Sequence, residues 1–132
     1  MKKLLFALAF FFQAAVSIGQ TQAELNATAL KEYREADRQL NAAYKAVLQR
    51  YKQDAVFIKN LKAAQLQWIR FRDAEMKMKY PDRPRGYYGS VQPMCWSAYI
   101  THLTQQRLQT LKQWIDGVAE GDACAGSVRV RP

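Results

Sequence analysis

The segment richest in side chains for recognition is a basic and aromatic stretch in the second half of the chain. Residues 77–85 contain four Lys or Arg side chains, and a tyrosine pair follows directly. Positive charge beside exposed aromatic rings suits binding of a partner, because Arg and Tyr provide large contact areas. We predict a partner-binding set made up of Arg83, Arg85, Tyr87, Tyr88 and Ser90. The alternative is a solvated turn whose tyrosines pack back on the helices and whose glycine and serine satisfy a helix end.

For catalysis the chain offers little. His102 is its single histidine, and no base or nucleophile can be assigned to it. Asp73 and Glu75 are two positions apart, so on a helix they point in different directions, unlike a carboxylate pair that acts on one bond. The motifs of serine hydrolases, zinc proteases, phosphate loops and dinucleotide sites do not occur. We therefore predict a protein that is not an enzyme, without catalytic residues, a cofactor or a metal site.

A second group of polar residues falls on or beside the apolar stripes of the expected helices. An unpaired charge is costly there, whereas a charge-assisted pair is tolerated. We predict a structural polar network that sets the register of three helices, formed by Asp37, Asn41, Gln65, Arg72, Asp73, Thr104 and Arg107. The expected pairs are Asp37 with Arg72 and Asp73 with Arg107. The alternative is a binding site built from the same residues.

A long first helix is indicated by the spacing of its large side chains. Between Leu30 and Tyr51 these side chains recur at steps of three and four, and Asp37 takes the one polar step. Asn26 or Thr28 is expected to cap its start, since short polar side chains accept bonds from the first free amides.

A second helix is expected to begin after its cap at Asp54 and to stop before Pro81. So short a connection makes the first two helices antiparallel. The predicted stripe of the second helix consists of Phe57, Leu61, Ala64, Trp68 and Phe71, flanked by Ile58, Gln65, Ile69 and Arg72. Residues 80–93 hold three of the four prolines and two glycines, which predicts a constrained loop without regular structure.

A third helix should have Pro93 in its first turn and Gly117 as its terminator. Its predicted apolar face consists of Trp96, Tyr99, Ile100, Leu103, Leu108, Leu111, Trp114 and Ile115. The small, polar tail beyond it is expected to be tethered through Cys124 and then to fray. These elements predict an all-α fold, a helical hairpin plus a third packed helix.

The start of the chain has the features of a secretory signal peptide. Two lysines precede an apolar run, and small residues then favour cleavage before Glu24, although an earlier cut would leave Gln20 first. The prediction is a signal peptide over residues 1–23 and one mature domain over residues 24–132. The apolar run is shorter than the roughly 20 residues of a spanning helix, so we expect a periplasmic or secreted protein without a membrane span.

Cys95 and Cys124 are the two cysteines of the chain. In an oxidising compartment we expect them to form one disulfide, which would stabilise the fold by about 3 to 4 kcal/mol. The alternative is a free or intermolecular thiol, because the sequence does not establish the geometry that a disulfide needs.

The chain has a formal net charge of +9, and without Lys2 and Lys3 it is +7. Such an excess favours anionic partners. In a bacterial envelope these are lipopolysaccharide, acidic lipids, wall polymers and acidic proteins, and we expect no nucleic acid partner. The alternative is a charge that only keeps the surface soluble.

Four short segments carry an ordered pattern of polar and aromatic residues. They read ADRQLNAAY at 36–44, AAQLQWIRFRDAE at 63–75, GS at 89–90 and LTQQR at 103–107. This pattern resembles the LprI-like lysozyme inhibitor family and covers most of the mature chain. The family commonly has a cysteine where Met76 stands and another early in the first helix, so one family disulfide is expected to be missing. Cys95 lies near the family's third cysteine.

The resemblance implies a secreted α-helical domain, in a family named after an inhibitor of animal-type lysozyme. The corresponding hypothesis is a noncatalytic inhibitor whose basic loop enters the acidic cleft of lysozyme. Net charge counts against it, because animal-type lysozymes are themselves basic. The alternatives are a basic envelope-binding module and a periplasmic protein-interaction domain.

Overall fold

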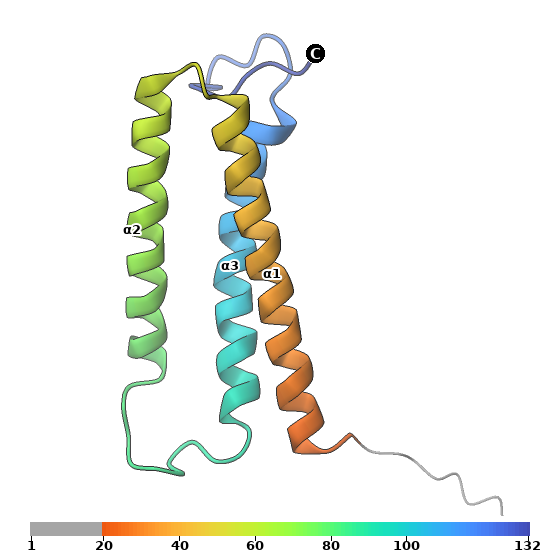
Figure 1. Cartoon of the computed structure of the whole chain (residues 1–132), viewed down its shortest axis with the longest axis vertical. Helices are drawn as coiled ribbons and strands as arrows, with labels where there is room; N and C mark the ends of the chain where they lie inside the picture. The colour runs from red at the N-terminus through yellow and green to blue at the C-terminus, as the bar shows by residue number, and fades with distance from the viewer. Residues whose placement is uncertain (1–19) are drawn as a thin grey trace, which may run out of the picture.

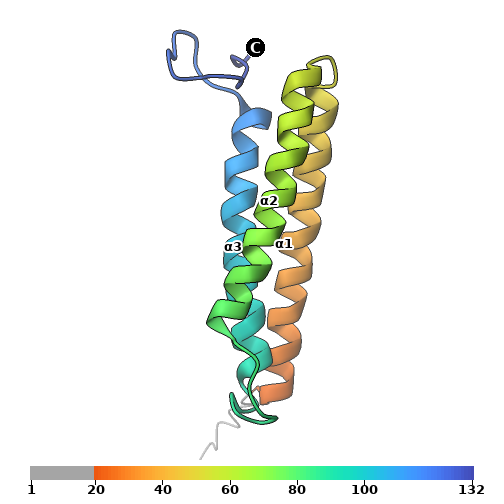
Figure 2. The ribbon, with the colours of Figure 1, turned by 90° about the vertical axis from the view of Figure 1, so that its left-hand side faces the viewer.

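The computed structural model describes residues 20–132, in which the chain forms three long helices (Figure 1). They are α1 (Gln22–Arg50), α2 (Ala55–Lys79) and α3 (Gln92–Asp116). The helices α1 and α3 run in the same direction, and α2 runs in the opposite one (Figures 1 and 2). The predicted all-α architecture is confirmed. Most of the predicted signal peptide lies outside the described residues.

The first helix begins earlier than predicted, because Thr21 caps it. The backbone N–H of Glu24 donates to Thr21 Oγ1 at 3.2 Å, and the Thr21 N–H donates to Glu24 Oε2 at 2.8 Å. This reciprocal pair is a capping box, which satisfies two amides at once. The predicted caps at Asn26 and Thr28 are wrong, since both residues lie inside α1. A cut before Glu24 would remove the cap.

The other predicted helix ends are confirmed. Asp54 caps α2, with its Oδ1 accepting the Phe57 N–H at 2.9 Å. The last residue of α2 precedes Pro81 by two positions, and Pro93 lies in the first turn of α3. Gly117 ends α3 with φ at +72°, in the left-handed region that a side chain disfavours.

The closest helix pair is α1 with α3, whereas α2 lies farther from both (Figure 1). Buried alanines recur every seven residues along α1, at Ala29, Ala36 and Ala43. The facing side of α3 is also small where Ser97 and Thr101 are buried. Small side chains let two helix backbones approach, so this pair packs more closely than the two arms of the expected hairpin.

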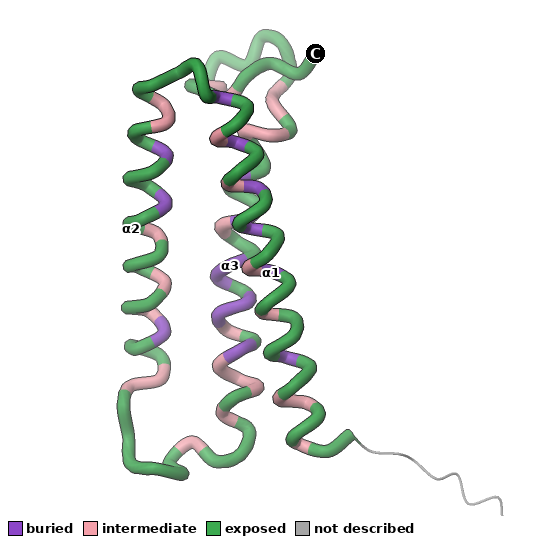
Figure 3. Tube along the Cα trace, in the orientation of Figure 1, coloured by how far each residue is buried: buried purple, intermediate pink, exposed green. Residues whose placement is uncertain are grey.

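The face that α2 turns toward the other helices differs from the predicted stripe. Leu61, Gln65 and Met76 are its buried residues, whereas Ala64 is exposed and Phe71 is 58% exposed. Figure 3 shows the buried positions of α2 on the side toward the other two helices. Phe57, Leu61 and Trp68 of the predicted stripe do pack on the core, whereas Ile69 of the predicted flank is exposed. The inward face thus lies between the two predicted sets. Gln65 is polar, so a hydrophobicity pattern alone assigns it to the wrong side.

The interior divides into two clusters along the bundle. One cluster is aliphatic apart from Tyr51, and its buried members are Leu40, Ala43, Val47, Tyr51, Leu61, Leu108 and Leu111. The other has Met76, Ile100 and Leu103 at its centre, with Tyr33, Tyr80, Trp96 and Tyr99 packed around them. The second cluster supports the segment between α2 and α3.

The C-terminal tail, residues 117–132, is seated on the bundle. Trp114 Nε1 donates to Ser127 Oγ at 2.9 Å, and the Arg129 N–H donates to the Tyr51 hydroxyl at 3.0 Å. The Arg129 guanidinium also lies 4.3 Å from the centre of the Tyr51 ring. The expectation of a tail tethered through Cys124 and then fraying is therefore wrong.

The predicted disulfide is not formed, and both cysteines carry free thiols. Cys95 lies in the first turn of α3, and Cys124 lies in the tail beyond the end of that helix. About 30 Å of helix separates Cys95 from the tail, at about 1.5 Å per residue, whereas a disulfide needs Cα atoms within about 7 Å. The expected staple is replaced by the contacts of Ser127 and Arg129.

Candidate functional site

The connecting loop, residues 80–91, joins α2 to α3 at the end of the bundle where α1 begins (Figure 1). Asn26 of α1 donates its side-chain amide to the carbonyl of Ser90 at 3.1 Å. The loop, which joins α2 to α3, is thus also bonded to α1.

None of the three helices described in residues 20–132 has the length and hydrophobicity of a membrane-spanning segment.

Two tight turns shape this loop. The Tyr87 N–H donates to the Pro84 carbonyl at 3.1 Å, and the Gly89 N–H donates to the Gly86 carbonyl at 3.0 Å. Gly86 has φ at +84° and Gly89 at +74°, values that glycine adopts without strain. The predicted constrained loop without regular structure is confirmed.

The two tyrosines of the predicted binding set have different environments. Tyr88 turns inward, where its hydroxyl donates to the Pro81 carbonyl at 2.7 Å and its ring meets Tyr80 edge to face at 5.8 Å. Tyr87 is 66% exposed, and the Arg83 guanidinium lies 5.7 Å from its ring centre. The cation–π contact holds Arg83 and Tyr87 together on the surface. Tyr88 supports the loop, and Tyr87 faces solvent.

The remaining members of the predicted set lie on the same loop. Arg85 and the Ser90 side chain are exposed, and the Ser90 carbonyl is bonded to α1. Arg83, Arg85 and Tyr87 therefore form one exposed group, which we call the loop tip. The alternative of inward-packed tyrosines applies to Tyr88 alone.

A tyrosine-rich base lies beneath the loop. Tyr99 donates its hydroxyl to Glu75 Oε1 at 2.6 Å, and Lys79 Nζ lies 4.2 Å from the centre of the Tyr99 ring. Burial, followed by the nearby Cys95 and Tyr88, raises the pKa of Tyr80 above its ordinary value. The residues at the end of α2 are thus held in place, so the loop tip projects from a fixed base.

Positive charge is concentrated on α2 and the connecting loop. Helix α2 has six basic and two acidic side chains, and the loop has two basic and one acidic. Together they carry +5 of the net +7 of residues 20–132, whereas the other segments are close to neutral. The loop tip lies at one end of this basic region.

The predicted ion pairs between helices are wrong. Arg72 bonds its neighbour Asp73, with Nη2 at 2.7 Å and Nε at 2.9 Å from Oδ1. Asp37 accepts a bond from Asn41 of its own helix at 3.1 Å. Both acids thus find partners locally, which costs less side-chain entropy than bridging to a distant helix.

One pair of residues from the predicted network does join two helices. Arg107 Nε of α3 donates to Gln65 Oε1 of α2 at 3.0 Å, and burial lowers the pKa of Arg107. Thr104 is fully buried and donates its hydroxyl to the Ile100 carbonyl at 2.7 Å, within α3. The predicted network is therefore a set of short local bonds with one bridge.

The histidine and the acidic residues considered for catalysis or metal binding lie as follows. His102 is exposed on α3. Within residues 20–132, no three side chains of His, Cys, Asp or Glu come together in a way that could hold a metal ion.

Relatives of the chain identify its family. Residues 14–111 match the sequence model of the family described as "Lysozyme inhibitor LprI". The chain is also 32% identical, over 107 residues, to "Uncharacterized protein R02472" of Rhizobium meliloti (strain 1021). The aligned region covers 73% of this chain and 75% of that protein. No solved structure matches the chain. The all-helical domain with its basic connecting loop thus belongs to the LprI lysozyme inhibitor family.

Proposed function

We propose that this protein is a noncatalytic inhibitor of animal-type lysozyme that acts in the periplasm or outside the cell. The family match supports the proposed activity. The loop tip carries the structural part of the proposal, because Tyr87 is 66% exposed while its neighbour Tyr88 is bonded to Pro81. A ring displayed on a fixed loop loses little conformational entropy when it binds.

The chemistry of the target suits this loop tip. Lysozyme cleaves its substrate between two carboxyl groups in an open cleft. Arg83 and Arg85 could pair with such carboxylates, and the Tyr87 ring could take the place of a sugar ring. Charge-assisted bonds that are buried when the loop fills the cleft are stronger than bonds at a solvated surface, so local attraction can outweigh the repulsion between two basic proteins.

The test is a titration of the exported protein against hen-type lysozyme acting on bacterial cell walls, at low and at physiological salt. We expect saturable inhibition at both salts, and at least a tenfold loss of potency in the R83A/R85A/Y87A variant, about 1.4 kcal/mol. Wild-type protein that leaves lysozyme fully active would contradict the proposed function. Full potency of the triple variant would contradict the role of the loop tip.

A control variant must separate the effect of net charge on inhibition from the effect of the specific contacts of the loop tip. K59A/K62A removes two positive charges from α2, as R83A/R85A does from the loop, and both lysines are exposed. We expect K59A/K62A to keep its potency and R83A/R85A to lose it. Equal losses would show that net charge, rather than the loop tip, governs inhibition.

The concentration of charge on α2 supports a second candidate, binding to anionic envelope material such as lipopolysaccharide. Exposed Lys59, Lys62, Arg70 and Lys77 lie on this helix, apart from the loop tip. Binding of this kind should weaken steeply with added salt, because exposed charges are screened. Here K59A/K62A should reduce binding, whereas Y87A should not.

A further inference from the structure

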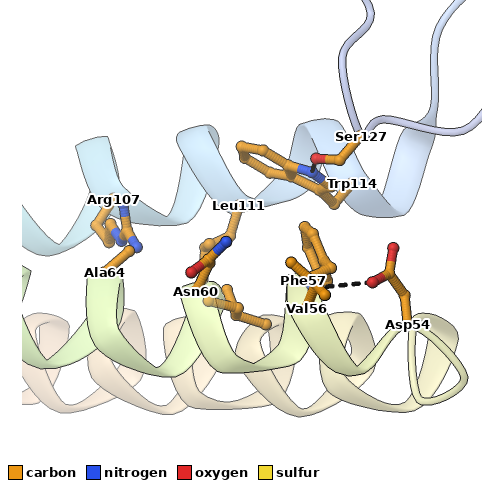
Figure 4. Close-up of a pocket in the computed structure, with 10 residues that line it drawn as sticks. Asp54, Val56, Phe57, Asn60, Ala64, Arg107, Leu111, Trp114 and Ser127 are labelled. Carbon is orange, nitrogen blue, oxygen red and sulfur yellow. Dashed lines mark hydrogen bonds between the residues drawn. The ribbon is translucent and has the colours of Figure 1, made fainter.

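A groove of about 450 Å³ lies between α2 and α3, in the half of the bundle away from the connecting loop (Figure 4). Its volume falls within the range of small-molecule sites, roughly 300 to 1,000 Å³. The apolar residues that line it are Val56, Phe57, Leu61, Ala64, Leu111 and Trp114. Leu61 and Leu111 are buried, whereas Val56, Phe57, Ala64 and Trp114 keep exposed surface along the groove.

The polar groups of the groove differ between its two ends. Arg107 lies at one end, and Asp54 and Ser127 lie toward the other (Figure 4). The Asp54 carboxylate caps α2, and the Ser127 hydroxyl accepts the indole N–H of Trp114. One end is thus cationic, and the other has a carboxylate that would repel an anion.

Arg107 has donor capacity that the protein does not use. Its Nε bonds Gln65, and no carboxylate of residues 20–132 lies within ion-pair distance of its guanidinium. A guanidinium has five N–H donors and readily accepts a carboxylate on two of them. Partial burial removes some of its water, so an anion at this end would meet a poorly solvated cation.

The walls of the groove favour an apolar chain over a peptide. Both walls are helices, whose backbone N–H and C=O groups bond within the helix. An extended peptide backbone placed there would find no free backbone partners on either wall, and a helical peptide is wider than the alkyl chain of a fatty acid, which has no polar groups to satisfy. Arg107 and Trp114 are two helical turns apart, about 10 Å at about 1.5 Å per residue, which suits a chain of medium length.

We propose that this groove binds a free fatty acid, with its acyl chain against Phe57, Leu111 and Trp114 and its carboxylate at Arg107. A free fatty acid fits better than a phospholipid, because a lipid with two chains exceeds a groove of this volume. The site is separate from the loop tip. It therefore does not depend on the proposed inhibition of lysozyme.

The first experiment is calorimetric titration of the exported protein with decanoate, below the concentration at which decanoate forms micelles. Decanol is the neutral control of equal chain length. We expect one saturable site for decanoate and at least about tenfold weaker binding of decanol, because decanol cannot form the charge-assisted bond. Absence of saturable decanoate binding, or equal affinity for both compounds, would overturn the proposal.

The second experiment locates the site with a matched pair of variants. Ala63 and Ala64 are both exposed on α2, and only Ala64 lines the groove. We expect A64F to fill the groove and weaken decanoate binding at least about tenfold, with A63F unchanged. R107Q should abolish the preference for decanoate over decanol. Unchanged binding by A64F would place the ligand elsewhere and refute the assignment.

Two further measurements test whether decanoate binding involves the loop tip or reflects binding to a lipid surface. The R83A/R85A/Y87A variant should bind decanoate like wild type, whatever its effect on lysozyme inhibition. In the absence of decanoate, wild type and A64F should cosediment equally with vesicles of anionic phospholipid. Cosedimentation that A64F removes would show that the groove takes a lipid surface, and would replace the fatty acid proposal.

Discussion

The connecting loop and the C-terminal tail are both without helix, yet they are held in different ways. In the loop, the Tyr88 hydroxyl bonds the Pro81 carbonyl seven positions away, and turn bonds span three positions. In the tail, the bond of Trp114 to Ser127 spans 13 positions and that of Arg129 to Tyr51 spans 78. The loop is therefore shaped mainly by bonds between near neighbours, with one bond to α1, whereas the tail adds to its short turns two bonds that hold it on the bundle.

The contrast shows what each segment needs in order to form. Prolines restrict the backbone of the loop before any helix packs, and its glycines adopt the positive φ of the turns without strain. The tail also has short turns, in which Asp122, Ala125 and Val128 each donate to a carbonyl three positions earlier. Its place on the bundle, however, depends on contacts with distant residues. We expect the tail to unfold together with the core cluster that contains Tyr51, and the loop to change its hydrogen exchange only when residues next to it are changed.

The largest expected effect is at Gly117, where the tail leaves α3. A Cβ atom there would lie 2.7 Å from the Arg129 carbonyl oxygen, and φ is +72°. We expect G117A to lower the free energy of unfolding by about 2 to 3 kcal/mol, since backbone strain and a clash with backbone combine. Urea unfolding measures this loss.

The matched control for Gly117 is Gly89 in the loop. Its φ is +74°, but a Cβ there would meet nothing within 4 Å. G89A should cost about 1 kcal/mol, from the left-handed backbone alone. Equal losses for the two variants would contradict the idea that the tail closes tightly on the end of α3.

A smaller effect is expected when the tail loses its bond to Tyr51. Y51F removes the hydroxyl that accepts the Arg129 N–H, which should cost about 1 kcal/mol. Hydrogen exchange should become faster at Arg129 and stay unchanged in the loop. Y88F is the counterpart, expected to quicken exchange at Tyr87 and Gly89 while the tail stays protected. Faster exchange at both ends in either variant would argue against independent segments.

The cap at the start of α1 is a third element that is held by bonds between near neighbours. Loss of the Thr21 cap in T21A should lower the free energy of unfolding by about 1 kcal/mol. Because a cut before Glu24 would remove this cap, we expect the exported protein to begin at Gln20. The intact mass of the exported protein checks this directly, and a mass that begins at Glu24 would restore the later cleavage site.

The smallest expected effect is a response of the loop to alkaline pH. Burial raises the pKa of Tyr80 above 10.0, so the folded state favours the neutral phenol. Its stabilising contribution is complete below pH 10 and decreases as the pH rises through the raised pKa. Nuclear magnetic resonance of labelled tyrosines should show loop signals shifting with the titration of Tyr80. Y80F should abolish that shift, and a shift that persists would assign it to another group.

Much of the candidate site followed from the sequence. The cluster of basic and aromatic residues predicted the loop tip, and the three helix ends at Asp54, Pro81 and Gly117 were also predicted. Two features were missed although the sequence contains their signals. One is the recurrence of alanine at every seventh position of α1, at Ala29, Ala36 and Ala43. The other is the capping box of Thr21 and Glu24.

The sequence by itself determined the three helices, their ends and the restricted loop between α2 and α3. These depend on caps, prolines, glycines and helical periodicity, which act over a few residues. Only the tertiary structure decided that α1 packs closest to α3, that Arg107 bonds Gln65, and that the two cysteines stay apart. Each of these outcomes depends on distances between positions or on competition among several partners, which arise only once the helices have assembled.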